Sequence, residues 1–130
     1  MNHDVPGLEA CKRLNWPATE SSFTRVLWWC ERSDSEPYLI ESSACQHVPS
    51  ATYTRAPTLG EMLAEIRRRG WHGGVKHYSP NQTGEPGFFG AVVGRKSSNG
   101  ETEYHHVHHK EPADAVALAL AEAIEKEGKA

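Results

Sequence analysis

Residues 88–109 read FFGAVVGRKSSNGETEYHHVHH, a segment with the pattern of a β-hairpin. Its first part, residues 88–95, is an apolar run of strand length. Asn99 and Gly100 form the dipeptide that tight hairpin turns prefer. The sequence therefore predicts that residues 101–109 return as a second, antiparallel strand.

Helices are expected on both sides of this hairpin. Thr58 and Glu61 match a capping box, in which each side chain binds the backbone amide of the other residue. This pattern predicts a helix that begins there and runs to about Arg69. After the hairpin, Pro112 suits a first helical turn. It predicts a second helix over residues 111–127.

The remaining elements are expected to complete an α+β fold in the order α-β-β-α-β-β-β-α. The most economical arrangement is a single domain over residues 1–130, with an antiparallel sheet of four to five strands and about three helices packed mainly on one face. The other expected segments are a helix from the N-cap Asp4 to about Asn15, strands at 23–31, 38–45 and 74–78, an irregular stretch at 46–57 and a long polar connection at 79–87.

Composition excludes several classes of protein. The 130 residues are 38% hydrophobic and 24% charged, a globular balance that is too apolar for a disordered chain. The formal net charge of −3 argues against a general positive field for nucleic acid, and it is too small for an acidic mimic of DNA. The composition thus carries no strong nucleic-acid signal.

Cysteine usage and hydropathy indicate a cytoplasmic protein. The three cysteines, Cys11, Cys30 and Cys45, form no CxxC pair, which argues against a disulfide framework or a zinc ribbon. The first residues lack the basic and apolar regions of a signal peptide. No apolar run approaches the roughly 20 residues that span a bilayer, so no membrane contact is expected.

Four histidines between residues 105 and 109 form the cluster with the clearest chemical potential. On a strand, alternate side chains share a face. His105 and His109 would therefore lie on one face, and His106 and His108 on the other. A histidine-rich strand can be simply solvated or part of an interface, or it can move protons and respond to pH.

The His106-x-His108 pair is also a candidate metal site. Its Cα atoms would lie ~6.5 Å apart, a spacing that can chelate a transition metal. Zinc would need at least one further protein ligand. The nearest candidates by topology are His72 and His77. Zinc is therefore a possible cofactor, and otherwise we expect none.

The densest basic and aromatic patch follows the first capped helix. Arg67, Arg68 and Arg69 with Trp71 can contact a phosphate or an acidic partner, because guanidinium groups match phosphate geometry. The alternative interpretation is structural: three arginines stabilise the negative C-terminal end of a helix.

Trp28 and Trp29 are adjacent on an expected strand, so one ring must face away from the other. If one face is core, the second tryptophan lies on the outer face and favours contact with a partner. Burial beneath a helix or in a homodimer would explain the pair equally well.

Three helix-start segments resemble those of small accessory proteins encoded by bacteriophages and prophages: Pro6–Leu14, Ala56–Leu63 and Glu111–Leu120. The resemblance implies a compact protein in the host cytoplasm. It also implies a protein that binds and neutralises a host component, such as antiviral defence machinery or its nucleotide signals.

The resulting hypothesis is a non-enzymatic binding protein that sequesters or inhibits a host protein or a small anionic or nucleotide ligand. One alternative is a metal-dependent hydrolase or nuclease that uses His106 and His108. Another is a structural or regulatory homo-oligomer. The candidate contact residues are Trp28, Trp29, Arg67, Arg68, Arg69, Trp71, His105 and His109.

Overall fold

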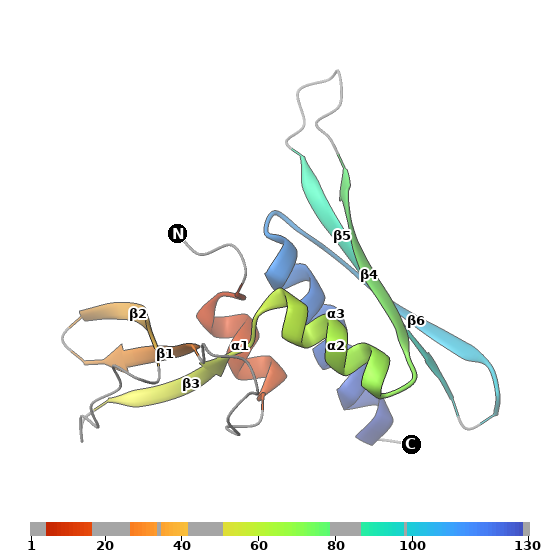
Figure 1. Cartoon of the computed structure of the whole chain (residues 1–130), viewed down its shortest axis with the longest axis horizontal. Coiled ribbons are helices and arrows are strands. Elements are labelled where there is room, and N and C mark those ends of the chain that lie inside the picture. The colour runs from red at the N-terminus through yellow and green to blue at the C-terminus, as the bar shows by residue number, and fades with distance from the viewer. Residues whose placement is uncertain are drawn as a thin grey trace.

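The computed structural model describes residues 5–16, 27–33, 35–41, 51–78, 87–97 and 99–128. In this part of the chain, three helices and six strands form an α+β fold (Figure 1). The elements in chain order are α1 (Leu8–Leu14), β1 (Leu27–Arg32), β2 (Ser35–Glu41), β3 (Thr52–Ala56), α2 (Leu59–Arg68), β4 (His72–Tyr78), β5 (Phe88–Lys96), β6 (Thr102–His109) and α3 (Pro112–Gly128).

The strands form two separate antiparallel sheets, ordered β2-β1-β3 and β4-β5-β6. The expected single sheet of four to five strands is therefore wrong. The helices lie between the two sheets (Figure 1). Each sheet packs its apolar side chains against a different side of the helical layer. The stretch expected to be irregular contains β3, which pairs with β1 and completes the first sheet.

Helix α3 is the centre of the molecule. It contacts α1, α2 and all three strands of the second sheet. Val116 and Leu120 are fully buried on it. Small side chains let several neighbours approach this one helix closely, which explains why alanine is so frequent in it. The buried alanines are Ala113, Ala115, Ala117, Ala119, Ala121 and Ala123.

A buried ion pair joins the first sheet to α2. Arg55 in β3 donates from Nη2 to Glu61 Oε2 at 2.8 Å, and both side chains are almost completely removed from solvent. Glu61 also completes the predicted capping box, because its Oε1 accepts from the Thr58 amide and its own amide donates to Thr58 Oγ1. One carboxylate thus fixes the start of a helix and its neighbouring strand.

Several expected elements are confirmed at nearly their predicted bounds. Helix α2 begins at its capping box, the hairpin β5–β6 is present, and α3 starts at Pro112. Other expectations lie outside the described residues. They concern Asp4, residues 23–26, residues 42–45 including Cys45, and the connection at 79–86.

Two adjacent glycines in β4 give a matched test of the packing between α2 and the second sheet. A Cβ atom on Gly73 would lie 2.9 Å from Ile66 Cγ2 and 3.2 Å from the Val92 carbonyl oxygen. One on Gly74 would meet no atom of the described part of the chain within 4 Å. We expect Gly73→Ala to lower the free energy of unfolding by about 1–3 kcal/mol, because Ile66 is buried and must move. Urea denaturation measures this.

Gly74→Ala is the control for that prediction. It adds the same methyl group where there is space, and alanine loses less backbone freedom on folding than glycine. The free energy of unfolding should stay constant or rise by up to about 1 kcal/mol. Equal destabilisation by the two substitutions would contradict the close approach of Ile66 to Gly73.

Cys11 is a buried thiol, and its burial, followed by the charge of Asp114, raises its pKa from 9.0 to about 12. We expect iodoacetamide at pH 8 to leave Cys11 unmodified in the folded protein, because the thiolate is the reacting form. In urea the same residue should react. Mass spectrometry of the Cys11 peptide measures the difference, and equal rates in both states would contradict it.

The raised pKa also fixes the sign of one pH effect. The folded state keeps the Cys11 proton, and the unfolded thiol ionises near its ordinary value. The stability due to this thiol is therefore fully present below pH 9.0 and is lost as the pH rises toward about 12.

Candidate functional site

The sheet β4-β5-β6 is covered on one face only within the described part of the chain, because all three helices lie on the same side of it (Figure 1). Val75, Ala91 and Val93 face the helices and pack in the core. The alternate residues face away from the helices. We call this surface the open face, and its residues are His72, Gly74, Lys76, Tyr78, Phe88, Gly90, Val92, Gly94, Lys96, Thr102, Tyr104, His106 and His108.

Aromatic rings gather at one end of the open face. Tyr78 stacks on Phe88 with ring centroids 4.9 Å apart, and the His108 ring lies 4.9 Å from Phe88. The Tyr78 ring leans over Gly90, where a Cβ atom would lie 2.8 Å from Tyr78 Cε2. Although packed in this way, Tyr78 remains 40% exposed. The cluster therefore presents aromatic surface to solvent.

A second exposed ring lies further along the same face. Tyr104 is 61% exposed and leans over Gly94, where a Cβ atom would lie 3.0 Å from its Cε1. Between the two ring groups, Val92 pairs with Gly74 on one side and His106 on the other. Because Gly74 has no side chain and that of Val92 is short, a trough of about 310 Å³ remains here. Its lining residues are Gly74, Val75, Lys76, Tyr78, Gly90, Ala91, Val92, His106 and His108.

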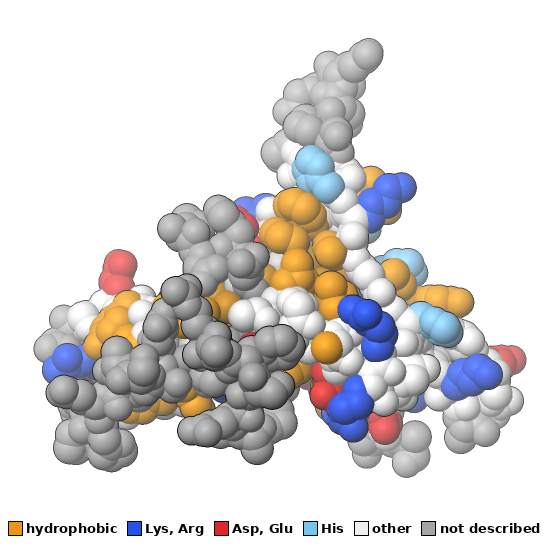
Figure 2. Space-filling view, in the orientation of Figure 1, with side chains coloured by type: hydrophobic (Ala, Val, Ile, Leu, Met, Phe, Trp, Pro, Cys, Tyr) orange, Lys and Arg blue, Asp and Glu red, His pale blue; other side chains and the backbone are white. Residues whose placement is uncertain are grey.

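The charge on the open face has one sign. Lys76 Nζ lies 5.3 Å from the centroid of the Tyr78 ring, and Lys96 projects from the far end of β5. Figure 2 shows Lys, Arg and His side chains interspersed with hydrophobic ones along the right-hand edge of the molecule, where the second sheet lies, together with an acidic side chain at the far right. None of the outward positions of β4, β5 and β6 carries an aspartate or glutamate. The face therefore suits an anionic partner.

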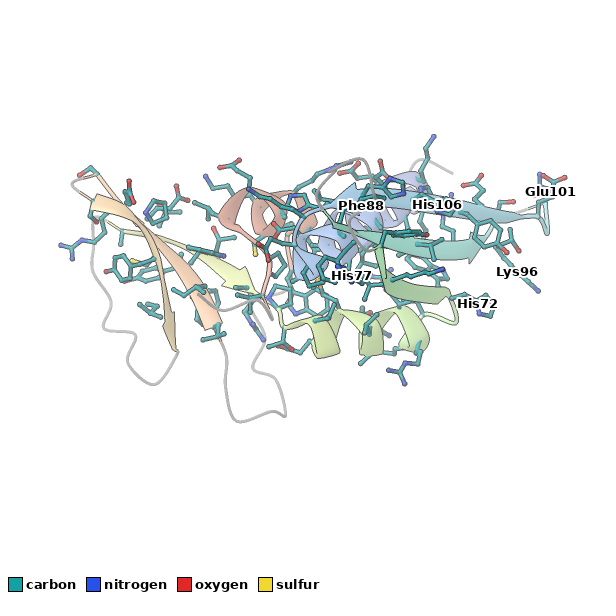
Figure 3. The ribbon with its side chains drawn as sticks, turned by 90° about the horizontal axis from the view of Figure 1, so that it is seen from above. His72, His77, Phe88, Lys96, Glu101 and His106 are labelled. Atoms are coloured by element: carbon teal, nitrogen blue, oxygen red, sulfur yellow. The ribbon has the colours of Figure 1, made fainter. Side chains whose placement is uncertain are left out.

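The structure separates the histidines by face, as the alternation predicts for an extended segment. His106 and His108 lie on the open face, whereas His77 lies on the helix side, with its ring 4.8 Å from Phe89 (Figure 3). His72 lies on the open face but at the opposite end from His108. Among the residues that the structure describes, no group of three or more His, Cys, Asp or Glu side chains could hold a metal ion.

His105 and His109 lie on the helix side of the sheet, away from the trough. The His105 side chain is 11% exposed, and its Nδ1 lies 4.0 Å from Glu122 Oε2 on α3. His109 Nδ1 accepts a hydrogen bond from the Glu111 amide at 3.0 Å, just before α3 begins. Both side chains thus connect β6 to α3, and neither shares a surface with His106 and His108.

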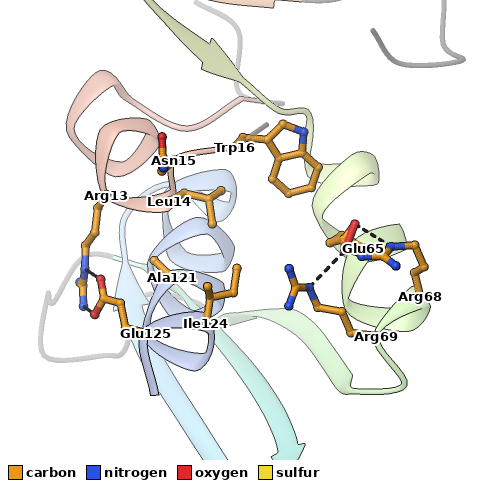
Figure 4. Close-up of a pocket in the computed structure, with 10 residues that line it drawn as sticks. All are labelled: Arg13, Leu14, Asn15, Trp16, Glu65, Arg68, Arg69, Ala121, Ile124 and Glu125. Atoms are coloured by element: carbon orange, nitrogen blue, oxygen red, sulfur yellow. Dashed lines mark hydrogen bonds and ion pairs between the residues drawn. The ribbon is translucent and has the colours of Figure 1, made fainter. Parts of the chain in front are cut away.

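Glu65 pairs with two of the three consecutive arginines (Figure 4). The hydrogen bond from Arg68 holds the pKa of Glu65 below its ordinary value, despite partial burial of the carboxylate. Arg69 also lies 5.1 Å from the centroid of the Trp71 ring. Arg67 is exposed at the end of the same helix. Much of the cationic charge expected from this run is balanced locally.

Arg68 and Arg69 border a pocket of about 400 Å³ between the ends of the three helices (Figure 4). Its walls include the apolar side chains of Leu14, Trp16 and Ile124. On the opposite rim, Arg13 pairs with Glu125 at 3.2 Å. The rim therefore carries paired charges of both signs, unlike the open face.

Trp28 and Trp29 are both half-buried in β1. The Trp29 indole donates to the Pro6 carbonyl at 2.9 Å and packs against the small core beside α1. Trp28 lines a crevice with Trp16 and Arg55. Neither ring lies near the open face, so the structure brings the predicted tryptophans, arginines and histidines together at no common site within the described residues.

The sequence reasoning missed the tyrosines. Tyr78 and Tyr104 are not among the predicted contact residues, yet they are two of the three large exposed hydrophobic side chains in the described part of the chain. A usable signal exists in β5, where Gly90, Val92 and Gly94 are spaced by two residues. Small residues at this spacing create room on one face of a sheet, which neighbouring aromatic rings can occupy.

Comparison with known proteins gives no further guide to the site. No protein-family model, curated protein or solved structure matches the chain significantly. Within the described residues, no helix has the length and apolar character needed to cross a membrane.

Proposed function

We propose that this chain is a non-enzymatic binding protein of the bacteriophage accessory kind, which sequesters a host component on the open face. The observation that carries the proposal is the exposure of Tyr78 and Tyr104 on one side of a sheet whose other side is core. Exposed aromatic side chains gathered on a single surface are typical of recognition sites.

Two further features support a recognition role. The open face combines aromatic rings with cationic side chains, and its described positions carry no carboxylate. Such a surface selects partners of negative charge. The helix-start segments that resemble phage accessory proteins also favour a protein that acts by occupying a target. Under this proposal α2 and α3 support the second sheet from its other face.

Affinity capture from a bacterial lysate tests the proposal, with quantitative mass spectrometry of the bound material. The wild-type chain is compared with a Tyr78→Ala/Tyr104→Ala variant. Tyr38→Ala is the matched control, because Tyr38 is also 40% exposed but lies in the first sheet. We expect the double variant to lose a specific target that the wild type and Tyr38→Ala retain.

A target that the Tyr78→Ala/Tyr104→Ala variant captures as well as the wild type would place the contact surface elsewhere and contradict the proposal. Circular dichroism and thermal unfolding of each variant provide the folding control. Turnover of the captured material by the wild-type chain, lost in the variant, would contradict the non-enzymatic part.

A further inference from the structure

We infer that the trough on the open face binds a nucleotide, with the base against the aromatic rings and the phosphate near Lys76. This inference rests on the proposed function, because it names the ligand class of the same face. The ligand is either a free mononucleotide or one unit of a single-stranded nucleic acid, since both present the same base and phosphate.

The shape of the trough supports a flat ligand. Gly74 and Val92 form a low central row between the Tyr78 and Tyr104 rings. A Cβ atom on Gly74 would meet no atom of the described residues within 4 Å, so they leave the space above it open. A volume of about 310 Å³ lies at the small end of ligand pockets, which matches a mononucleotide better than a larger metabolite.

The chemistry of the walls supports a base rather than an aliphatic group. Tyr78 and His108 offer ring surfaces at one end of the trough, and every nucleobase has a flat face that can stack on such rings. His106 stands beside the floor and can hydrogen-bond to a base edge or a sugar hydroxyl. Stacking of this kind tolerates different bases, so we expect weak preference among them.

The charge of the face supports a phosphate. Lys76 lines the trough, and no described outward position of the three strands bears a carboxylate that would repel an anion. The net charge of −3 describes the whole chain and does not conflict with this local excess of cations. A second copy of the chain fits less well, because two open faces would bring lysines of like charge together.

Isothermal titration calorimetry and amide chemical-shift mapping on the full chain test the inference with four probes. AMP carries base and phosphate, adenosine lacks the phosphate, and inorganic phosphate lacks the base. A ten-nucleotide single-stranded DNA carries several units. We expect AMP or the DNA to bind more tightly than adenosine and phosphate, with shifts concentrated at residues 74–78 and 104–108.

Three substitutions test the contacts. Tyr78→Ala should weaken binding roughly tenfold, the scale expected for loss of one stacking ring. Lys76→Ala should weaken it and reduce its dependence on salt. Gly74→Val should abolish it, because the added side chain occupies the space above the floor without touching another residue at its Cβ. Tyr38→Ala should bind like the wild type.

The outcomes separate the ligand sources and the two proposals. Binding of AMP alone identifies a free nucleotide, and a strong preference for the DNA identifies a single strand. The nucleotide inference is overturned if neither AMP nor the DNA binds, or if AMP and inorganic phosphate bind with equal affinity. If lysate capture still depends on Tyr78 in that case, the open face binds a protein and the proposed function stands. If AMP binds with affinity unchanged in Tyr78→Ala and Gly74→Val, the trough is not the site.

Discussion

Replacing Glu61 with alanine is expected to lower the free energy of unfolding by about 3–5 kcal/mol, the usual cost of leaving one partner of a buried ion pair unpaired. Arg55 is 3% exposed, so its guanidinium would keep its charge with little access to water. Arg55 Nη1 also donates to the Ala56 carbonyl oxygen at 2.8 Å. Urea denaturation at neutral pH measures the loss.

Two variants identify the cause of the Glu61→Ala effect. Glu61→Gln can keep the side-chain oxygen that the capping box needs, but its amide nitrogen then faces the Arg55 guanidinium as one donor against another. A loss of stability close to that of Glu61→Ala would therefore assign the effect to the ion pair. Glu125→Ala breaks the exposed pair with Arg13 and should cost at most about 1 kcal/mol. A Glu61→Ala effect no larger than that of Glu125→Ala would mean that the buried pair contributes little.

Replacing Leu120 with alanine is expected to destabilise the protein by about 2–5 kcal/mol, because the substitution leaves a cavity at the centre of the core. Leu120 is fully buried on α3, and the residues on either side of it in the sequence, Ala119 and Ala121, have side chains too small to fill the space. The effect should appear as a lower urea midpoint with an unchanged dependence on urea concentration.

Leu118→Ala is the matched control for this prediction. The substitution is chemically identical and lies on the same helix, so the change in helix propensity is the same. Leu118 is only partly buried, and less packing is lost. Its destabilisation should therefore be clearly smaller. An equal effect at both positions would show that α3 is not packed most tightly around Leu120.

The features of the fold that depend on local sequence could be predicted. The Thr58–Glu61 box sets the start of α2 because both partners lie within one helical turn. The hairpin β5–β6 also follows from neighbouring residues. The division into two sheets could not be predicted, because strand pairing is decided over long distances. The strand Thr52–Ala56 ends in an arginine and an alanine next to Pro57, and its burial depends on Glu61 accepting from Arg55.

The candidate site could be predicted only in part. Alternation along β6 correctly assigns His106 and His108 to one face, since this depends only on the strand being extended. Which face is covered depends on where the helices lie, and the histidine pattern is the same in either case. The stacking of Tyr78 on Phe88 also requires the register between β4 and β5, which sequence periodicity does not supply.

The central position of α3 has a consequence for the order of events during translation. Its contacts reach far back along the chain, as in the bond from the Gly7 amide to the Asp114 carboxylate, 107 positions apart. Because α3 is the last of the described elements to be synthesised, a nascent chain must hold the apolar sides of β5 and β6 uncovered until that helix emerges. Ribosome-bound intermediates of this protein should therefore be substrates for chaperones, and final assembly should be late and abrupt.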